Sequence, residues 1–216
     1  MSTAAILAGG RARRFGGRPK LLLPLGDRRI VDRLLAALGT VVDQVLIVAN
    51  DRETYAGLGV PVHPDVLAGA GPLGGVHAAL GASPSSRTLV VAGDMPFLDT
   101  TFLAHLLHAG GAVDVAVPRT RDGYQPLCAC YRAGCVPLIE RRIAAGALRL
   151  GAAVDAMRRH ELGADEIEPF DPDGTLFFNV NTPADHARAL ALAAYHDRWR
   201  PRAPLPGSPG AREHGR

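Results

Sequence analysis

The chain has 216 residues, 47% of them hydrophobic, and a formal net charge of +3, a composition that suits a soluble domain with a substantial core. Its apolar runs are short and broken by charged residues, so neither a membrane span nor a secretory leader is expected. We predict a cytoplasmic protein with a single folded domain over residues 1–197 and no membrane partner.

The first predicted element is a buried strand over residues 2–8, which runs directly into a glycine-rich loop that ends at Lys20. Gly9 and Gly10 mark the place where the backbone turns sharply. Glycines let main-chain N–H groups approach an anion, and the arginines of the loop add positive potential, so the segment predicts a triphosphate site. Its spacing matches neither a P-loop nor a dinucleotide-binding motif. A flexible surface turn is the alternative interpretation.

Lys20 is the only lysine in the chain, beside 23 arginines. A composition so biased toward arginine would be expected to replace any lysine that supplies positive charge alone. Lysine offers a compact point charge on a flexible stem, whereas arginine is a wide planar fork. The survival of Lys20 therefore indicates that an amine is required, and a phosphate oxygen reached through a narrow opening is the natural partner.

The loop carries a pattern that resembles a known family. It reads L-A-G-G-x3-R-x-G-x3-K, in which the fixed positions are Leu7, Ala8, Gly9, Gly10, Arg14, Gly16 and Lys20. This pattern is similar to the signature of the molybdenum cofactor guanylyltransferases, and the resemblance runs from Thr3 to about Ala194. The resemblance implies the nucleotide-diphospho-sugar transferase type of fold. Relatives that use cytidine nucleotides more often read L-A-A-G here, so the resemblance favours guanine over cytosine as the base of the nucleotide substrate.

Strand patterns alternate with helical patterns along the body of the chain. Buried strands are predicted at residues 45–49, 60–62, 88–92 and 113–117, and helices at 30–38, 73–80 and 101–109. Such alternation predicts a three-layer, Rossmann-like α/β fold, with a mostly parallel sheet and helices on both faces. Ligands of these folds bind beyond the carboxyl ends of the strands, where Gly9, Asn50, Asp65 and Asp94 fall.

Asp94 is the predicted metal ligand. It follows a buried strand directly, and Gly93 and Pro96 form a tight exit that would leave the carboxylate facing the crevice. Magnesium prefers hard oxygen donors and bridges carboxylates to phosphate oxygens. A helix N-cap or turn aspartate is the alternative. The resemblance assigns this position to Mg²⁺ and to the α-phosphate side of the nucleotide.

Asp65 begins a loop, residues 64–75, that leads into a helix. Its carboxylate could accept hydrogen bonds from a nucleotide, although a plain loop with a helix start at Pro72 explains the same residues. The family pattern reads G-P-L-A-G at this helix, so Gly74 departs from it at one position.

Two later segments resemble the acceptor side of the family's site. Residues 124–128 alternate like a strand. Residues 177–181 predict a second strand that carries Asn179 and Asn181 on one face, before Thr182 caps a helix. Paired amides suit pterin or phosphate recognition, and the resemblance places this segment by the pterin substrate.

The three cysteines, Cys128, Cys130 and Cys135, have a spacing that fits neither a disulfide framework nor a tetrahedral zinc site. We interpret them as small core residues.

The tail, residues 198–216, holds five arginines and one glutamate, so residues 1–197 carry a net charge of −1. It is rich in Pro, Gly and Arg, which predicts disorder, and nucleic-acid binding is not expected.

By resemblance, the chain transfers GMP from GTP to molybdenum-loaded molybdopterin with Mg²⁺ at Asp94. The GTP site comprises Leu7, Ala8, Gly9, Gly10, Lys20, Asn50, Asp65 and Asp94, the catalytic residues are Lys20, Asp94 and Arg14, and Asn179 and Asn181 contact the pterin. Molybdoenzymes or cofactor-delivery proteins are possible transient partners. The alternatives are a cytidylyltransferase for the same pterin, a guanylyltransferase for another phosphorylated small molecule, and a binding module without catalysis.

Overall fold

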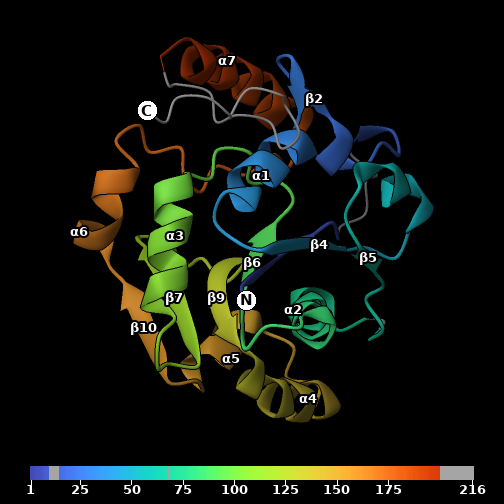
Figure 1. Cartoon of the computed structure of the whole chain (residues 1–216), viewed down its shortest axis with the longest axis vertical. Coiled ribbons are helices and arrows are strands. Elements are labelled where there is room, and N and C mark those ends of the chain that lie inside the picture. The colour runs from blue at the N-terminus through green and yellow to red at the C-terminus, as the bar shows by residue number, and fades with distance from the viewer. Residues whose placement is uncertain (10–14, 68, 200–216) are drawn as a thin grey trace, which may run out of the picture.

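The chain builds a three-layer α/β fold in the computed structural model, which describes residues 1–9, 15–67 and 69–199 (Figure 1). Its strands are β1 (Thr3–Leu7), β2 (Pro24–Leu25), β3 (Arg28–Arg29), β4 (Gln44–Val48), β5 (Val62–His63), β6 (Arg87–Ala92), β7 (Val115–Thr120), β8 (Gly123–Tyr124), β9 (Cys128–Arg132) and β10 (Arg159–Leu162). Its α-helices are α1 (Ile30–Gly39), α2 (Gly71–Ala82), α3 (Thr100–Ala109), α4 (Val136–Ala144), α5 (Leu150–Asp155), α6 (Ala164–Ile167) and α7 (Pro183–Trp199). Short 3₁₀ turns are η2 (Lys20–Leu22), η3 (Glu53–Leu58), η4 (Ala133–Cys135) and η5 (Glu168–Phe170).

The central sheet of the described residues has the strand order β10-β7-β9-β6-β1-β4-β5, with β8 paired to β7. β1 lies between β6 and β4 and is parallel to both, β5 extends the sheet in parallel with β4, and β10 is parallel to β7. β9 is antiparallel to its neighbours β6 and β7. The predicted fold class, a mostly parallel sheet with helices on both faces, is confirmed.

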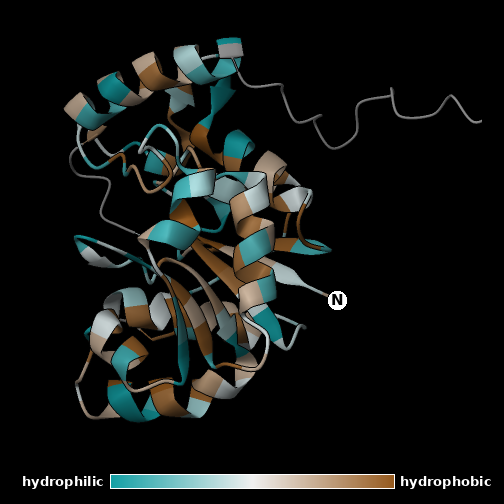
Figure 2. Cartoon of the chain, turned by 90° about the vertical axis from the view of Figure 1, so that its left-hand side faces the viewer, coloured by the Kyte–Doolittle hydropathy of each residue, from teal (hydrophilic) through white to brown (hydrophobic). Residues whose placement is uncertain are grey.

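Alternate side chains of the strands supply two separate hydrophobic layers. On β1, Ala4 and Ile6 pack in the cluster that contains the buried faces of α1 and α3, whereas Ala5 and Leu7 pack with α2, α4 and α5. This period of two is what a strand buried on both faces requires. Figure 2 shows the hydrophobic residues concentrated on these central strands, with more polar residues on the outer helices.

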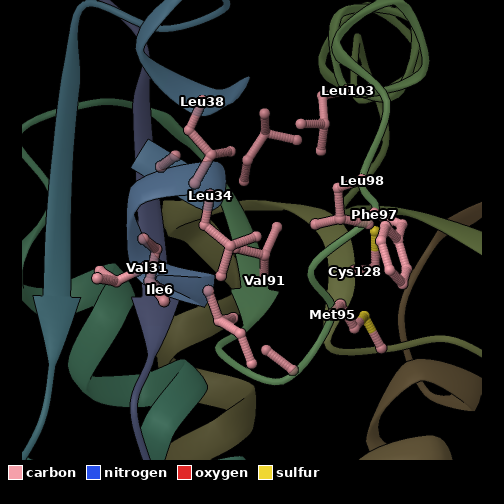
Figure 3. Packing of buried hydrophobic residues seen from close by; sticks show 14 of the residues in the cluster. Ile6, Val31, Leu34, Leu38, Val91, Met95, Phe97, Leu98, Leu103 and Cys128 are labelled. Carbon is pink, nitrogen blue, oxygen red and sulfur yellow. The ribbon is translucent and has the colours of Figure 1, made fainter. Parts of the chain in front are cut away.

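Helix α1 illustrates how the sequence pattern produces the packing. Val31, Leu34 and Leu38 recur at helical spacing and are all buried against the sheet, where Ile6 and Val91 meet them (Figure 3). Burying each such side chain contributes about 1.5–3 kcal/mol relative to leaving it exposed. This layer packs against the central strands β1 and β6, and the candidate site lies beyond the carboxyl ends of these strands.

The structure corrects two of the predicted strands. Residues 125–127 form a turn between β8 and β9, because Pro126 has no N–H to donate to a ladder. Residues 177–181 form an irregular segment, in which the buried Val180 donates its N–H to the main-chain oxygen of Asp94 at 2.9 Å. The strand predicted at 60–62 is observed as β5, which overlaps it only at Val62.

Cys128, Cys130 and Cys135 are all buried and free, as predicted for small core residues. Burial raises the pKa of the Cys128 thiol to about 12 and that of Cys135 to about 11, so both remain neutral thiols.

The last helix, α7, lies against β2 at the top of the molecule in Figure 1. It extends two residues into the segment assigned to the tail, and residues 200–216 lie outside the described residues. Within the described part of the chain, no helix is both long enough and apolar enough to cross a bilayer.

Candidate active site

The candidate site forms where β1, β4 and β6 end side by side. Leu7 is in register with Val48 on one side and with Ala92 on the other. Two main-chain hydrogen bonds extend this alignment past the strand ends, from Ala8 N to Val48 O at 2.9 Å and from Gly93 N to Leu7 O at 3.0 Å. The residues that follow the three strands, among them the predicted Gly9, Asn50 and Asp94, therefore meet at one edge of the sheet.

Gly93 is required at this edge because other parts of the chain approach it closely. A Cβ at position 93 would lie 3.0 Å from Leu21 Cδ1 and 3.1 Å from Leu7 O. Leu21 is the buried residue of η2, the turn that begins at Lys20. The absence of a side chain at position 93 thus lets the end of the glycine-rich loop pack directly against the strand that leads to Asp94.

The described part of the glycine-rich loop starts again at Phe15, whose ring lies edge-on to that of His186 in α7, with the centroids 6.3 Å apart. Gly16 and Gly17 follow with φ angles of +61° and +85°, in the left-handed region that other residues rarely adopt. They let the chain turn back toward the site. The predicted Gly10 and Arg14 lie outside the described residues.

Lys20 lies at the centre of the site. Its Nζ donates a hydrogen bond to Asn181 Oδ1 at 2.8 Å and lies 3.7 Å from Asp94 Oδ2. The structure thereby joins a predicted nucleotide-side lysine to a predicted acceptor-side asparagine 161 residues away in sequence.

Asp94 is largely enclosed, with 23% of its side chain exposed. Burial raises the pKa of its carboxyl, while the nearby charge of Lys20 opposes that shift. A partly buried carboxylate with a cationic neighbour is a typical feature of functional sites rather than of solvated surfaces. The structure thus does not support the interpretation of Asp94 as a plain helix N-cap, a role that Asp99 fills for α3.

Asn50 and Asp65 are joined directly. The Asn50 carboxamide oxygen accepts the N–H of Asp65 at 2.9 Å, and Asp65 Oδ1 accepts the N–H of Leu67 at 3.1 Å. The carboxylate lies against the first turns of α2, where a Cβ on Gly74 would come within 3.1 Å and 3.2 Å of its two oxygens. Gly74, which departs from the family pattern, leaves room for Asp65 in this position.

A pocket of about 280 Å³ opens beside Asp94. Its walls come from the start of α2, the end of β6, the turn before β9 and the start of α5, and the lining residues are Pro72, Ala92, Asp94, Met95, Gln125, Pro126, Leu127, Leu150 and Asn179. Apolar walls with a few amide groups suit a flat heterocycle that needs oriented hydrogen bonds. Asn179 therefore lines this pocket, whereas Asn181 points its carboxamide oxygen to Lys20.

Leu150 is not identifiable from the sequence. It reaches the pocket from α5, an element without a motif, and no spacing rule connects it with Asp94, whereas Met95 directly follows Asp94 in the predicted strand exit. Asp185, whose carboxylate accepts the N–H groups of Asn181 and Thr182, could have been found from the capping pattern T-x-x-D that starts α7.

A mostly parallel sheet that holds a glycine-rich loop, a lysine and a carboxylate at its strand ends has the make-up of a nucleotidyltransferase. Residues 4–161 match the family model of the MobA-like NTP transferase domain. The chain is 36% identical over 192 residues to the probable molybdenum cofactor guanylyltransferase of Pelotomaculum thermopropionicum, covering 89% of this chain and 93% of that one. The protein therefore belongs to the MobA-like NTP transferase family.

Two further relatives agree with this assignment. The molybdenum cofactor guanylyltransferase of Desulfosudis oleivorans is 33% identical, over 88% of this chain and 94% of its own. Among solved structures, the molybdopterin-guanine dinucleotide biosynthesis protein A of Archaeoglobus fulgidus is similar with a TM-score of 0.77 at 27% identity, over 89% of this chain and 99% of that one.

Proposed function

We propose that the protein transfers GMP from GTP to molybdenum-loaded molybdopterin, which yields the guanine dinucleotide form of the molybdenum cofactor and pyrophosphate. The observation that carries this proposal is the position of Asp94. Its carboxylate lies 3.7 Å from the amine of Lys20 and also lines the pocket of about 280 Å³. One group thus borders both the end of the glycine-rich loop and a cavity that we assign to the second substrate.

The nucleotide side of the proposed site is the edge formed by β1 and β4. Leu7, Ala8 and Gly9, continued by Gly10, offer main chain to GTP, and Asn50 and Asp65 offer polar side chains from the neighbouring loops. Lys20 serves the phosphates, and Arg14 is proposed to assist it. The hydrogen bond between Asn50 and Asp65 fixes both groups before the nucleotide enters, which reduces the entropy lost on binding.

The acceptor side is the pocket between α2, β9 and α5. We propose that the pterin lies against Met95, Leu127 and Leu150 and that Asn179 and Gln125 supply its hydrogen bonds. Asn181, which the sequence assigns to the pterin, lies at the boundary of the two substrates because its carboxamide oxygen is bonded to Lys20.

In the proposed reaction, a terminal phosphate oxygen of the acceptor forms a bond to the α-phosphorus of GTP. The bond from that phosphorus to the bridging oxygen breaks, and pyrophosphate leaves with the electron pair. The attacking phosphate is already ionised, so the protein needs no general base and no covalent intermediate. Its residues act by alignment and by placing positive charge beside the developing negative charge, a role that we assign to the Lys20 amine.

Asp94 fits the magnesium ion that this chemistry implies. Magnesium is held by one or two carboxylates together with substrate phosphates and water, and Asp94 is a partly enclosed carboxylate beside the proposed phosphate site. In the part of the chain that the structure describes, no group of three or more His, Cys, Asp or Glu side chains could hold a metal ion. The bound ion would neutralise charge on the phosphates.

We further propose that the protein acts in the cytoplasm as a single domain and contacts molybdoenzymes or cofactor-delivery proteins transiently.

The experiment that tests the proposed function compares GTP with CTP at saturating molybdenum-loaded molybdopterin and Mg²⁺. We expect GTP to be turned over at least tenfold faster. A preference for CTP would replace the guanine assignment, and turnover of GTP only with a different phosphorylated acceptor would replace the pterin assignment.

A further inference from the structure

Lys20 is held in place before any substrate is bound. An ammonium group has three N–H donors and no acceptor. One of them is used by Asn181 Oδ1 at 2.8 Å, and a second side faces Asp94 Oδ2 at 3.7 Å. The Lys20 and Asp94 side chains are each 23% exposed, whereas Asn181 is exposed, so its hydrogen bond holds the amine at the solvent side of the site.

Asn181 is itself fixed by the start of α7. Asp185 Oδ2 accepts the N–H of Asn181 at 3.0 Å and the N–H of Thr182 at 2.8 Å. In return, Thr182 Oγ1 accepts the N–H of Asp185 at 3.1 Å. Carboxylate acceptors make stronger hydrogen bonds to main-chain N–H groups than neutral acceptors do. The segment that carries the Asn181 carboxamide is therefore clamped by a charged group.

The helix behind this clamp is anchored at both ends. His186 Nε2 lies 2.6 Å from the main-chain oxygen of Pro24, and Asp197 accepts two hydrogen bonds from the Arg33 guanidinium, at 2.5 Å and 3.0 Å. Ala189 and Ala193 are fully buried between these anchors. Asp185 thus projects from a rigid element.

We propose that Asp185 is a positioning residue for the Lys20 ammonium. It fixes Asn181, whose carboxamide oxygen holds Lys20 beside Asp94, so that the third N–H of the amine is left for a phosphate oxygen. Asp185 does not touch substrate and acts through Asn181. The inference rests on the proposed function, because it takes the phosphates of a nucleotide as the target of Lys20.

The charges around the Asp185 carboxyl agree with its proposed role in positioning Lys20. Contacts with Thr182 and with the N–H of Asn181 hold the pKa of the Asp185 carboxyl below its ordinary value, and the positive charge of Lys20 acts in the same direction. Asp185 is therefore ionised throughout the neutral range. Lys20 lies in the field of Asp94 on one side and of Asp185 behind Asn181 on the other.

Because the chain has a single lysine, an NMR signal from its side chain directly reports the contacts from Asp185 through Asn181 to Lys20. Protein labelled with ¹⁵Nζ-lysine has one side-chain nitrogen signal, which reports the hydrogen bonding of Lys20 without any turnover. In Asn181→Ala the signal should move toward that of a free solvated lysine. Asp185→Ala should move it in the same direction, because the carboxamide is no longer held in place.

Thr182→Ala is the matched control. It removes an acceptor from the same helix start, but it leaves the Asp185 carboxylate on the N–H of Asn181. Both Thr182→Ala and Asp185→Ala should lower the melting temperature, whereas only Asp185→Ala should shift the Lys20 signal. Asp185→Asn keeps an acceptor oxygen without the charge and should give an intermediate shift, which provides a second test if Asp185→Ala does not fold.

The kinetic consequence is a selective loss of rate. Removing a preorganised donor typically costs about 10²- to 10³-fold. In Asp185→Ala the donor and its partner Asn181 both remain but the Asn181 carboxamide is no longer fixed, so we expect kcat to fall about tenfold. The KM for the acceptor should change less than twofold, and Thr182→Ala should keep the parent kcat.

An unchanged Lys20 signal in folded Asp185→Ala, or an equal shift in Thr182→Ala, would overturn the inference. Failure of the proposed function gives a different result. In that case no variant transfers GMP, but the Lys20 signal still distinguishes Asp185→Ala from Thr182→Ala.

Discussion

At the scale of single residues, the structure gives a physical reason for the only lysine in an arginine-rich chain. The amine of Lys20 fits between the carboxamide of Asn181 and the carboxylate of Asp94, in a space bounded by the close packing of Gly93 on Leu21. A planar guanidinium at the same position would extend past these partners.

Lys20→Arg is therefore expected to lower kcat by about 10²- to 10³-fold although the charge is kept, since a donor aimed at the transition state is displaced. Steady-state kinetics with GTP measure the effect. Arg18→Lys, a charge-conserving change at an exposed position two residues earlier, is the control and should remain within a few-fold of the parent. Parent-like activity of Lys20→Arg would show that the amine has no special role.

Asp94 leads to a prediction about pH. Burial raises its pKa, so its neutral form is favoured in the folded state, and the group's favourable contribution to stability is present at low pH and lost as the pH rises through the folded-state pKa. Asp94→Asn removes the buried charge and should keep or raise the melting temperature at neutral pH without metal. It should also abolish Mg²⁺-dependent turnover.

In the parent protein, Mg²⁺ must compete with a proton for Asp94. Activity should therefore fall on acidification at a pH above the ordinary aspartate range, and excess Mg²⁺ should move that fall to lower pH. A calorimetric titration of Mg²⁺ with GTP at several pH values measures this competition. Equal Mg²⁺ affinity in the parent and in Asp94→Asn would remove Asp94 from the metal site.

At the scale of elements, the strands and helices from β1 to α3 are largely predictable from the sequence because each carries a local pattern. Val31, Leu34 and Leu38 give α1 its buried stripe, and the apolar run before Asp94 marks β6. The second half is harder. β9 runs antiparallel between two parallel strands, and nothing in its own residues records that pairing.

The site residues divide in the same way, into those that their local sequence indicates and those that it does not. Lys20, Asp94, Asn50 and Asp65 each stand beside a glycine-rich turn or a strand end, so their sequence neighbours indicate where they lie. The contact between Lys20 and Asn181 spans 161 residues, and neither residue's local sequence indicates it. The role assigned to Arg14 stays a prediction.

The packing at Gly93 gives a prediction at this scale. Gly93→Ala places a Cβ 3.0 Å from Leu21 Cδ1 and 3.1 Å from the Leu7 oxygen, so these neighbours must shift by a few tenths of an ångström, and we predict that η2 shifts with Leu21 and displaces Lys20. We expect at least a tenfold loss of kcat, measured with GTP and acceptor at saturation.

Gly81→Ala is the control, because the exposed Gly81 in α2 has no atom within 4 Å of its ideal Cβ. It should keep full activity and gain about 0.5–1 kcal/mol in stability from its better helix propensity. Similar kinetics for the two variants would contradict the account of β6 and η2.

At the scale of the whole molecule, every residue of the proposed site lies between Leu7 and Asn181, and α7 closes the described fold at Trp199. Deleting residues 200–216 should therefore leave the KM for GTP and the melting temperature within error of the parent. Ending the chain after His196 should lower the melting temperature, because Arg33 loses its two hydrogen bonds to Asp197. A large rise in the KM for GTP after the shorter deletion would show that the tail contributes to the site.

The proposed reaction joins the α-phosphate of GTP to the phosphate of a molybdenum-loaded pterin. Its most direct test follows GTP labelled at the α- or at the γ-phosphorus through one turnover with the acceptor and Mg²⁺. We predict that the α-label appears only in the guanine dinucleotide product and the γ-label only in pyrophosphate, in equal amounts. Release of the γ-label as inorganic phosphate, or an α-label that never enters the pterin product, would contradict the account.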